Sequence, residues 1–287
     1  MPELPEVQTV VNTLAPHIVG TKILRIVHLR PDIVTPPTCD LAKNLTGRTI
    51  QSIHRRAKRI VITLDDGHTF FIHLGMSGRL TLDATETPIP LHTHLILELS
   101  PRSMGVSPMH LRFKDPRRFG GIFVCADDTA HDANLGPEPL TLKPNDLAPR
   151  LAKTKRAIKN VLLDQRVIAG LGNIYVDESL HDARIHPLAR ADRLKPDQIR
   201  CLTASIQRVL KKAIQHRGST LRDYVDAQGG KGAFQRLHKV YDRAGHPCPA
   251  CRTPIRRIVL GGRSTCFCPV CQPRRASAKS TARHRMQ

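Results

Sequence analysis

The apolar residues of this chain follow two different periods, and the change of period divides the sequence. Residues 2 to 16 have the three-and-four spacing of a helix, which Pro16 is expected to end. The apolar face of that helix consists of Val7, Val10, Val11 and Leu14. From about residue 21 to 125 the apolar residues form short or alternating runs, such as RIVITL and HTFFIHL, between turn sequences such as DDG and GMSG. This stretch is predicted to be all β, as a sandwich.

The second half of the chain returns to helical spacing after a proline-rich break. Residues 135–149 carry four prolines and little periodicity, so they are predicted to be an interdomain linker. Successive helices are predicted beyond them, and the longest reads PDQIRCLTASIQRVLKKAIQHRG. Its apolar face consists of Ile199, Leu202, Ile206, Val209, Leu210 and Ala213. A glycine-rich loop follows at 218 to 232, and then a β-like module that contains paired cysteines.

These changes of pattern predict an α+β protein with several parts. We expect an N-terminal helix and β-sandwich over 1–134, the linker over 135–149, a helical domain with the glycine-rich loop over 150–237, and a cysteine-rich module over 238–272. Residues 273–287 hold basic but no acidic side chains. They are predicted to be a disordered tail that binds phosphates.

The charge of the chain is strongly positive. It carries 45 Lys and Arg against 24 Asp and Glu, a formal charge of +21 with a pI of about 10.3. So large an excess predicts a polyanionic partner, of which nucleic acid is the leading candidate. A membrane surface is the alternative, but the sequence has no run of about 18 apolar residues and no dominant basic amphipathic helix. The N-terminus also lacks the basic and apolar segments of a signal peptide, so a cytoplasmic protein is expected.

Four cysteines stand in two CxxC pairs, which are Cys248 with Cys251 and Cys268 with Cys271. Two such pairs with 16 residues between them have the spacing of a structural zinc site with four thiolate ligands. Because the protein would supply all four ligands, no coordination position is left for catalysis. The alternatives are two chance pairs or a redox dithiol.

The segment between the two pairs, RTPIRRIVLGGRSTCF, is predicted to be a β-hairpin with its turn at GGR. Arg256, Arg257 and Arg263 would make this hairpin basic, and Arg263 would project beyond the sheet. Such a hairpin suits DNA phosphates. A solvated basic hairpin is the alternative, and composition does not separate the two.

The N-terminal sequence MPELPEV places Pro2 where removal of Met1 would leave a free secondary amine. An α-amino group has a pKa of about 7.7 to 8.0 against about 10.4 for lysine, so more of it is neutral and nucleophilic at pH 7. Attack by this amine on C1′ of a deoxyribose would displace the base and leave an iminium, from which strand cleavage by elimination follows. Glu3 is placed to move protons, and Lys58 supplies a cation that would offset its charge. The alternative is an ordinary helix start with acids at the positive end of the helix dipole.

Several longer motifs, together with PELPEV and the paired cysteines, resemble those of the formamidopyrimidine-DNA glycosylases, bacterial enzymes that repair 8-oxoguanine. The motifs are AKRIVITL, HLGMSGRL, DPRRFG, LGPEPL, GLGNIYVDE, GSTLRDYVDAQGGKGAFQ and GGRST before CPVCQ, and the match runs from residue 2 to about 272. The resemblance implies an N-terminal helix with a β-sandwich, a helix-two-turn-helix domain and a zinc finger, with DNA in the cleft between them.

The same resemblance implies an activity and its partners. The expected function is base-excision repair, in which the enzyme removes 8-oxoguanine and formamidopyrimidines from double-stranded damaged DNA and nicks the abasic site by β,δ-elimination. One structural Zn²⁺ is the only cofactor expected. We also expect a monomer that does not bind membranes and lies in the bacterial cytoplasm with the nucleoid.

Position by position, the resemblance assigns chemistry to five residues. Pro2 resembles the Schiff-base nucleophile of the family, and Glu3 resembles its proton donor in base release. Lys58 resembles the lysine that serves β-elimination, and Arg263 resembles the finger arginine linked to δ-elimination and phosphate binding. Glu6 resembles the acid that contacts the damaged nucleotide.

Chemistry at C1′ requires the nucleotide to leave the base stack, and this leaves a hole opposite the orphaned base. Met76, Arg117 and Phe119 resemble the side chains that fill this hole in the family. Arg117 would contact the cytosine that has lost its partner base, and Phe119 would insert into the adjacent step of the base stack. From residue type alone, Met76 and Phe119 would be core residues. Arg118, in the same DPRRFG motif, is also expected to contact DNA.

Contacts to the DNA backbone are expected mainly from the helical half of the chain. Asn173, in the GLGN hairpin, is placed to hold a phosphate together with helix-end N–H groups, and the alternative is that it supports the turn. The other candidates, each of which has a solvated surface position as its alternative, are His92, Lys155, Lys159 and Tyr241.

Two features depart from the family pattern. The segment SPRSMGVSPMH precedes DPRRFG, so the support of that loop is expected to differ. Cys266 stands where the family often has an aromatic residue, and it is a third thiol in the hairpin that could compete for zinc, although the spacing favours Cys268.

Two other functions stay open at this point. One is an endonuclease VIII-type glycosylase for oxidised pyrimidines, a group that tends to have glycine where Leu4 stands and a shorter glycine-rich loop. The other is a non-catalytic zinc-ribbon protein that binds DNA as a scaffold and needs neither Pro2 nor Glu3.

Overall fold

A computed structural model describes residues 2–103, 105, 107–125, 132–222 and 224–274. The predicted basic tail lies outside the described residues except for its first two positions, and part of the SPRSMGVSPMH segment lies outside them as well. Among the residues described, no helix combines the length and the apolar composition needed to span a lipid bilayer.

The N-terminal helix, α1 (Leu4–Ile18), starts with a proline in its first turn, where no intrahelical N–H bond is lost. The backbone N–H of Glu3, the residue before it, donates to Oε2 of Glu6 at 2.8 Å. The predicted apolar face is buried. The prediction that Pro16 ends the helix was wrong, because a proline in the last turn removes only one hydrogen bond and the helix continues to Ile18.

Two sheets follow α1, as the alternating pattern over residues 21 to 125 predicted. The first sheet is antiparallel and has the order β1 (Ile23–Leu29), β7 (Thr93–Leu99), β8 (Met109–Lys114) and β6 (Arg79–Ala84). The second has the order β2 (Val34–Thr35), β9 (Gly121–Cys125), β5 (Thr69–His73), β4 (Arg59–Leu64) and β3 (Ile50–Arg56). Only β2 and β9 pair in parallel in it. Two short helical segments, η1 (Pro31–Ile33) and α2 (Leu41–Leu45), interrupt this part of the chain.

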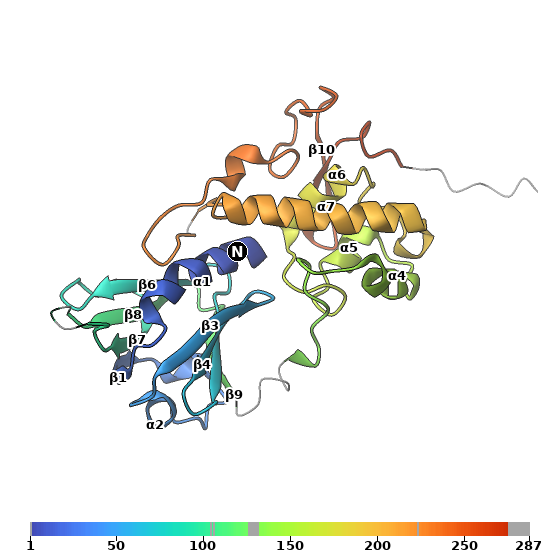
Figure 1. The fold of residues 1–287 in the computed structure, drawn as a ribbon. Helices are drawn as coiled ribbons and strands as arrows, with labels where there is room; N and C mark the ends of the chain where they lie inside the picture. The colour runs from blue at the N-terminus through green and yellow to red at the C-terminus, as the bar shows by residue number, and fades with distance from the viewer. Residues whose placement is uncertain (1, 104, 106, 126–131, 223, 275–287) are drawn as a thin grey trace, which may run out of the picture.

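The two sheets and α1 share one hydrophobic core. It contains Val7 and Leu14 of α1, Ile62 and Phe70 of the second sheet and Phe113 of the first, among others. Helix α1 packs against β3 on one side and against the long helix of the second half on the other (Figure 1). The predicted β-sandwich with an N-terminal helix is therefore confirmed.

Four helices form most of the second half. They are α4 (Pro144–Ala152), α5 (Ile158–Leu162), α6 (Asn173–Asp182) and α7 (Pro196–Gln215), with 3₁₀ turns η2 (Ala191–Arg193) and η3 (Phe234–Leu237). All six residues of the predicted apolar face of α7 are buried, as expected. The linker predicted at 135–149 is partly helical, because Pro144 starts α4 and Leu147 is fully buried. Proline is well suited to the first position of a helix, so the prolines there did not indicate an unstructured segment.

Helix α1 also belongs to the second core. Leu4 packs with residues of α4 to α7, such as Ile174 and Leu210, and its N–H donates to the carbonyl of Gly170 at 3.0 Å. The first turn of α1 is thus held by the helical half, while the predicted apolar face of α1 packs in the core of the sandwich. This arrangement places the N-terminus between the two halves (Figure 1).

The C-terminal module is the predicted β-hairpin, with β10 (Arg256–Leu260) paired to β11 (Arg263–Phe267). Its turn consists of Gly261 and Gly262, which both have positive φ angles that favour glycine. The core of the module is small and consists of Val240, Ile255, Cys248, Cys266 and Cys268. Strand β11 packs against α6, so the hairpin is in contact with the helical half.

Candidate active site and metal centre

Glu3 is fixed at the N-terminus of α6. Its carboxylate accepts hydrogen bonds from the backbone N–H groups of Gly172 at 2.7 Å, Ile174 at 2.9 Å and Tyr175 at 3.3 Å. Only 3% of the residue is exposed. A helix N-terminus is a site for anions, so the GLGN turn holds the carboxylate that follows Pro2. A Cβ atom at Gly172 would collide with the Glu3 side chain, which explains the glycine at this position.

Pro2 is buried directly before Glu3, and Met1 lies outside the described residues. Lys58 follows Ala57 in the turn between β3 and β4, and it too is buried. Burial lowers the pKa of Lys58, the charge of Arg263 acts in the same direction, and the carboxylates of Glu3 and Glu6 oppose them. The structure therefore brings the residues of the predicted catalytic set together, although they come from three separate parts of the chain.

Glu6 is buried and bonded to protein groups. Besides the N–H of Glu3, its carboxylate accepts bonds from the hydroxyl of Tyr175 at 2.5 Å and the N–H of Ser219 at 2.7 Å. Burial raises the pKa of Glu6 to about 7, and the charge of Glu3 adds to this. The predicted direct contact with a nucleotide does not fit this burial. In this structure Glu6 instead fastens the start of the glycine-rich loop, where a Cβ at Gly218 would lie 2.6 Å from Oε1 of Glu6.

Arg263 is exposed at the tip of the hairpin, as predicted. The next residue anchors the tip, because the carbonyl of Ser264 accepts bonds from Nζ of Lys159 at 2.8 Å and Nδ2 of Asn173 at 2.9 Å. On the other side of the turn, Gly261 lies against Asn160 of α5. The hairpin is thereby fixed with Arg263 close enough to Lys58 to influence its pKa.

The prediction that Lys159 contacts DNA needs correction. Its side chain is completely buried, and Nζ forms an ion pair with Asp177 at 2.7 Å as well as the bond to Ser264. Asn173 likewise donates a hydrogen bond to the carbonyl of Ser264. This contact favours the alternative to phosphate binding, namely that Asn173 supports the local structure. Both residues hold the hairpin on α5 and α6, and the sequence missed this because Asp177 and Ser264 are distant in the chain.

The remaining backbone-contact candidates differ in exposure. Lys155 is exposed. Tyr241 is half-buried, with its ring 5.5 Å from that of His238 and its N–H bonded to Glu178 at 2.8 Å. His92 is exposed with a φ of 67°, and its carbonyl accepts the N–H of Asp115 at 3.0 Å. Of these, Lys155 and His92 are accessible to a phosphate, and their contacts with DNA stay predictions.

The three residues predicted to fill the hole in the base stack, which we call the wedge, lie together on the surface and are Met76, Arg117 and Phe119. Met76 is 42% exposed and Phe119 is 57% exposed, so the alternative that they are core residues is wrong. The guanidinium of Arg117 lies 5.0 Å from the centre of the Phe119 ring. Arg118 is exposed and pairs with Asp32 at 3.1 Å.

Asp115 organises these two loops, and the sequence did not reveal it. Its buried carboxylate accepts bonds from the hydroxyl of Ser77 at 2.6 Å and the N–H of Gly120 at 2.8 Å. Gly75 packs so closely on the backbone of Phe119 that no side chain would fit there. The loop with Met76 and the loop with Phe119 are thus held together by the bonds of Asp115 and by direct backbone contact. The aspartate at the head of DPRRFG was the available signal, since Asp often stabilises turns through such bonds.

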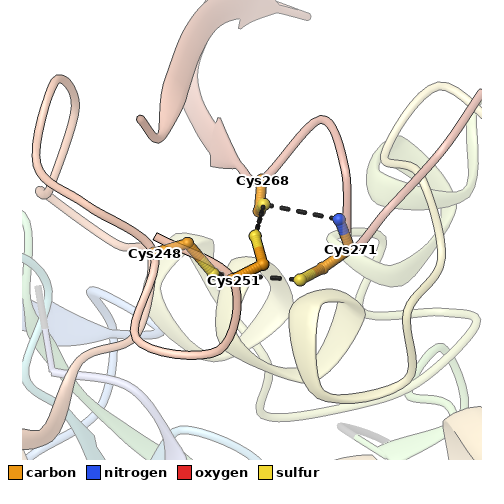
Figure 2. A group of neighbouring side chains, drawn as sticks. All are labelled: Cys248, Cys251, Cys268 and Cys271. Carbon is orange, nitrogen blue, oxygen red and sulfur yellow. Dashed lines mark hydrogen bonds between the residues drawn. The ribbon is translucent and has the colours of Figure 1, made fainter. Parts of the chain in front are cut away.

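The four paired cysteines converge (Figure 2). Their sulfur atoms all lie within 4.8 Å of one another, with Cys248 and Cys271 3.9 Å apart and Cys251 and Cys268 3.4 Å apart. Four sulfurs placed about 2.3 Å from a tetrahedral zinc ion would be about 3.8 Å apart, so the cluster fits one structural Zn²⁺. Cys266 is not part of the cluster. It is buried beside α6, where its N–H donates to Asp177 at 2.9 Å.

Comparison with known proteins agrees with this geometry. The family model for the formamidopyrimidine-DNA glycosylase N-terminal domain matches residues 1–122, the H2TH domain model of the same enzyme matches 135–225, and the model for a zinc finger found in FPG and IleRS matches 245–274. The chain is 45% identical to the formamidopyrimidine-DNA glycosylase of Chloroflexus aurantiacus over 277 residues, which cover 95% of this chain and 98% of that protein. The chain belongs to the formamidopyrimidine-DNA glycosylase family.

Other relatives extend the comparison. The formamidopyrimidine-DNA glycosylase of Gluconobacter oxydans is 44% identical, with 95% of this chain and all of that protein covered. A solved Lactococcus lactis FPG mutant in complex with Fapy-dG containing DNA superposes with a TM-score of 0.87 at 37% identity, over 95% of this chain and 100% of that one. The complex of Lactococcus lactis Fpg with an abasic site containing DNA gives 0.86 at the same identity and coverage. The predicted family, fold class, glycosylase activity and structural zinc are confirmed.

Proposed function

We propose that the protein removes oxidised purines, namely 8-oxoguanine and formamidopyrimidines, from double-stranded DNA and then nicks the abasic site by β,δ-elimination. The observation that carries the proposal is the position of the Glu3 carboxylate. Three backbone N–H groups of the helical half hold it directly after buried Pro2, and it is close enough to Lys58 to influence the pKa of that residue. The solved family complexes with Fapy-dG and abasic DNA support this class of substrate.

The first step uses the N-terminal amine. Once Met1 is removed, the nitrogen of Pro2 forms a bond to C1′ as the bond from C1′ to the base breaks, and the base leaves with a proton. Loss of the amine proton and opening of the sugar ring, in which O4′ takes up a proton, then give an iminium. Glu3 is the group that supplies and recovers protons in these steps, because its carboxylate adjoins Pro2 and is held in one orientation.

The second step cleaves the strand. The iminium acidifies the C2′ proton, and its removal expels the 3′ phosphate as the bond from C3′ to oxygen breaks. Burial lowers the pKa of Lys58, so a larger share of this amine is neutral and able to accept the proton than for an exposed lysine. Arg263 at the exposed hairpin tip would bind the phosphate whose departure completes δ-elimination.

Access to C1′ requires a flipped nucleotide. We propose that Met76, Arg117 and Phe119 enter the vacated space, since they are exposed side chains on two loops that are held together. Insertion of such side chains costs a few kcal/mol of unstacking, which the positive charge of the protein offsets through phosphate contacts.

The remaining parts of the proposal concern the state of the protein. One chain supplies the amine, the carboxylate, the wedge and the hairpin, so we propose a monomer. We likewise propose that the protein acts in the bacterial cytoplasm with the nucleoid, since its proposed substrate is double-stranded DNA.

The covalent intermediate provides the test. Sodium borohydride added during reaction with an 8-oxoguanine:cytosine duplex is expected to trap the protein on DNA, and peptide mass spectrometry should locate the adduct on Pro2. A protein with extra residues before Pro2 should give no adduct, because its proline nitrogen is an amide. Equal trapping by the extended protein would contradict the role of Pro2. A faster reaction with a thymine glycol duplex than with 8-oxoguanine would instead favour an endonuclease VIII-type activity.

A further inference from the structure

The turn that carries Lys58 is held by a cluster that the proposed chemistry leaves unexplained. Oε1 of Glu138 accepts bonds from the N–H of Ala57 at 2.7 Å and from Nη1 of Arg56 at 2.9 Å. Oε2 of the same carboxylate accepts a bond from Nη2 of Arg55 at 2.6 Å. We call Glu138 with Arg55 and Arg56 the Glu138 clamp. Its parts come from β3 and from the LGPEPL motif, more than 80 residues later.

The clamp acts on an unfavourable backbone conformation. Ala57 has a φ of 54°, which residues with a side chain rarely adopt unless the surroundings impose it. Both of its backbone polar groups are held by the clamp, the N–H by Glu138 and the carbonyl by Nη1 of Arg55 at 3.0 Å. Arg55 is in turn bonded to Gln8 of α1 at 2.9 Å.

The clamp is also fixed to the helical half that holds Glu3. Nη2 of Arg56 donates to the carbonyl of Gly136 at 3.2 Å, and the N–H of Gly136 donates to the carbonyl of Gln165 at 2.8 Å. A Cβ at Gly136 would meet the backbone of Val167 at 2.6 Å. The clamp therefore ties the turn to the segment of the helical half that runs from Gly136 to Gln165.

We propose that Glu138 is a positioning residue for strand cleavage, which fixes the β3 to β4 turn so that the amino group of Lys58 stays buried beside Glu3 and Arg263. This rests on the proposed role of Lys58 in elimination. Glu138 does not touch the reacting atoms in this scheme. It acts through the backbone of Ala57, the residue directly before Lys58.

The matched variants are Glu138→Gln and Asp132→Asn. Asp132 also pairs with Arg56, at 2.6 Å, but it makes no bond to Ala57 in the structure. With a preformed abasic duplex, E138Q is expected to slow β-elimination at least tenfold under single turnover, while D132N stays within about twofold of wild type. The pH profile of elimination should move to higher pH in E138Q alone, since a loosened turn exposes Lys58 to water.

A second measurement does not depend on turnover. Reductive ¹³C-methylation followed by NMR titration, with Lys58→Arg for assignment, should show a higher pKa for Lys58 in E138Q than in wild type. An unchanged Lys58 titration overturns the clamp proposal, as does a rate loss that D132N shares. A wild-type protein that fails to cleave the abasic duplex would instead refute the proposed function, and the titration would still decide the role of Glu138.

An independent observation concerns the metal centre. Nε2 of His181, in the last turn of α6, lies 3.5 Å from the sulfur of Cys248, while Nδ1 of this buried ring has no hydrogen-bond partner among the described residues. A thiolate bound to zinc carries no proton, so the imidazole has to be the donor in this contact. Four thiolates around Zn²⁺ leave a net negative charge, which such donors stabilise.

We infer that His181 is an outer-shell residue of the zinc site, donating a hydrogen bond from Nε2 to the Cys248 thiolate. A second donor to the cluster is visible in the N–H of Cys271, which lies 3.4 Å from the sulfur of Cys268. His186 provides the comparison, because it is also a buried histidine near the finger. Its ring packs edge-on to Phe267 at 4.7 Å and its Nδ1 accepts the N–H of Leu188, and among the described residues it has no hydrogen bond to a cysteine.

Zinc release from the full-length holoprotein tests this role. With 4-(2-pyridylazo)resorcinol as the zinc-binding dye, His181→Phe is expected to release zinc about tenfold faster or more, and His181→Gln, which keeps an N–H group, less than that. His186→Phe should stay within about twofold of wild type. In the Co²⁺-substituted protein, the sulfur-to-metal charge-transfer band should move to lower energy in H181F. Release and band position both unchanged in H181F and H181Q would overturn the inference.

Discussion

Replacing Glu3 with glutamine is expected to slow base release by about 10²- to 10⁴-fold, the usual contribution of a general acid-base group. Glutamine has nearly the same shape and still offers an oxygen to the N–H groups of α6, but it cannot donate and recover a proton. Single-turnover release of 8-oxoguanine from a defined duplex measures the effect. On a preformed abasic site the loss should be smaller, because the base is already gone.

Glu178 supplies the control for that experiment. It is another buried carboxylate on α6 that accepts three backbone N–H bonds, from Lys239, Val240 and Tyr241. Glu178→Gln should lower the melting temperature without a comparable loss of the chemical step. If E3Q and E178Q slowed base release equally, Glu3 would be a structural residue and the assignment of acid-base catalysis would be wrong.

Loss of the metal is expected to unfold the C-terminal module and abolish stable DNA binding. Apart from cysteines, the core of this module contains only Val240 and Ile255, so its stability has to come from zinc binding, which contributes roughly 10 to 16 kcal/mol in small zinc modules. Cys268→Ser or prolonged chelation should therefore raise amide hydrogen exchange in β10 and β11. Because Ser264 of this hairpin anchors Lys159 and Asn173, the effect should extend to α5 and α6.

Cys266→Ser is the matched variant for the metal experiment. Cys266 is buried in the same hairpin, but it is not among the four converging cysteines. The variant should retain one zinc per chain by elemental analysis, whereas C268S should not. Loss of zinc from C266S would show that the fifth thiol is a ligand and that the ligand set has to be revised.

The elements that depend on local pattern could be predicted from the sequence. Residues that are close in the sequence determine the apolar face of α7, the alternating strands and the two cysteine pairs. Each of these features is found in the structure. Pro16 and Pro144 were misleading, because proline is compatible with the last turn and the first position of a helix as well as with its interruption.

The polar interior could not be predicted in the same way. Lys159 is a surface residue by composition, and only the approach of Asp177 and Ser264 explains its burial. Glu6 likewise meets Tyr175 and Ser219 only after the chain has folded. A buried polar residue needs a hydrogen-bond partner. Its residue type does not reveal which of the many distant donors or acceptors becomes that partner in the fold.

The division of α1 between two cores has a consequence for synthesis on the ribosome. Glu3 and Leu4 are among the first residues made, yet Ile174, which bonds to Glu3, follows 171 residues later, and α7 later still. At an elongation rate of about 5 to 20 residues per second, this delay is roughly 10 to 35 s. The sandwich has its own strands in place well before then. A nascent chain can thus pair the strands of the sandwich while the acid at its N-terminus still lacks the helix that holds it. The proposed catalytic centre is completed only near the end of translation, as is the core of the sandwich, which also contains Tyr224 and Ala227.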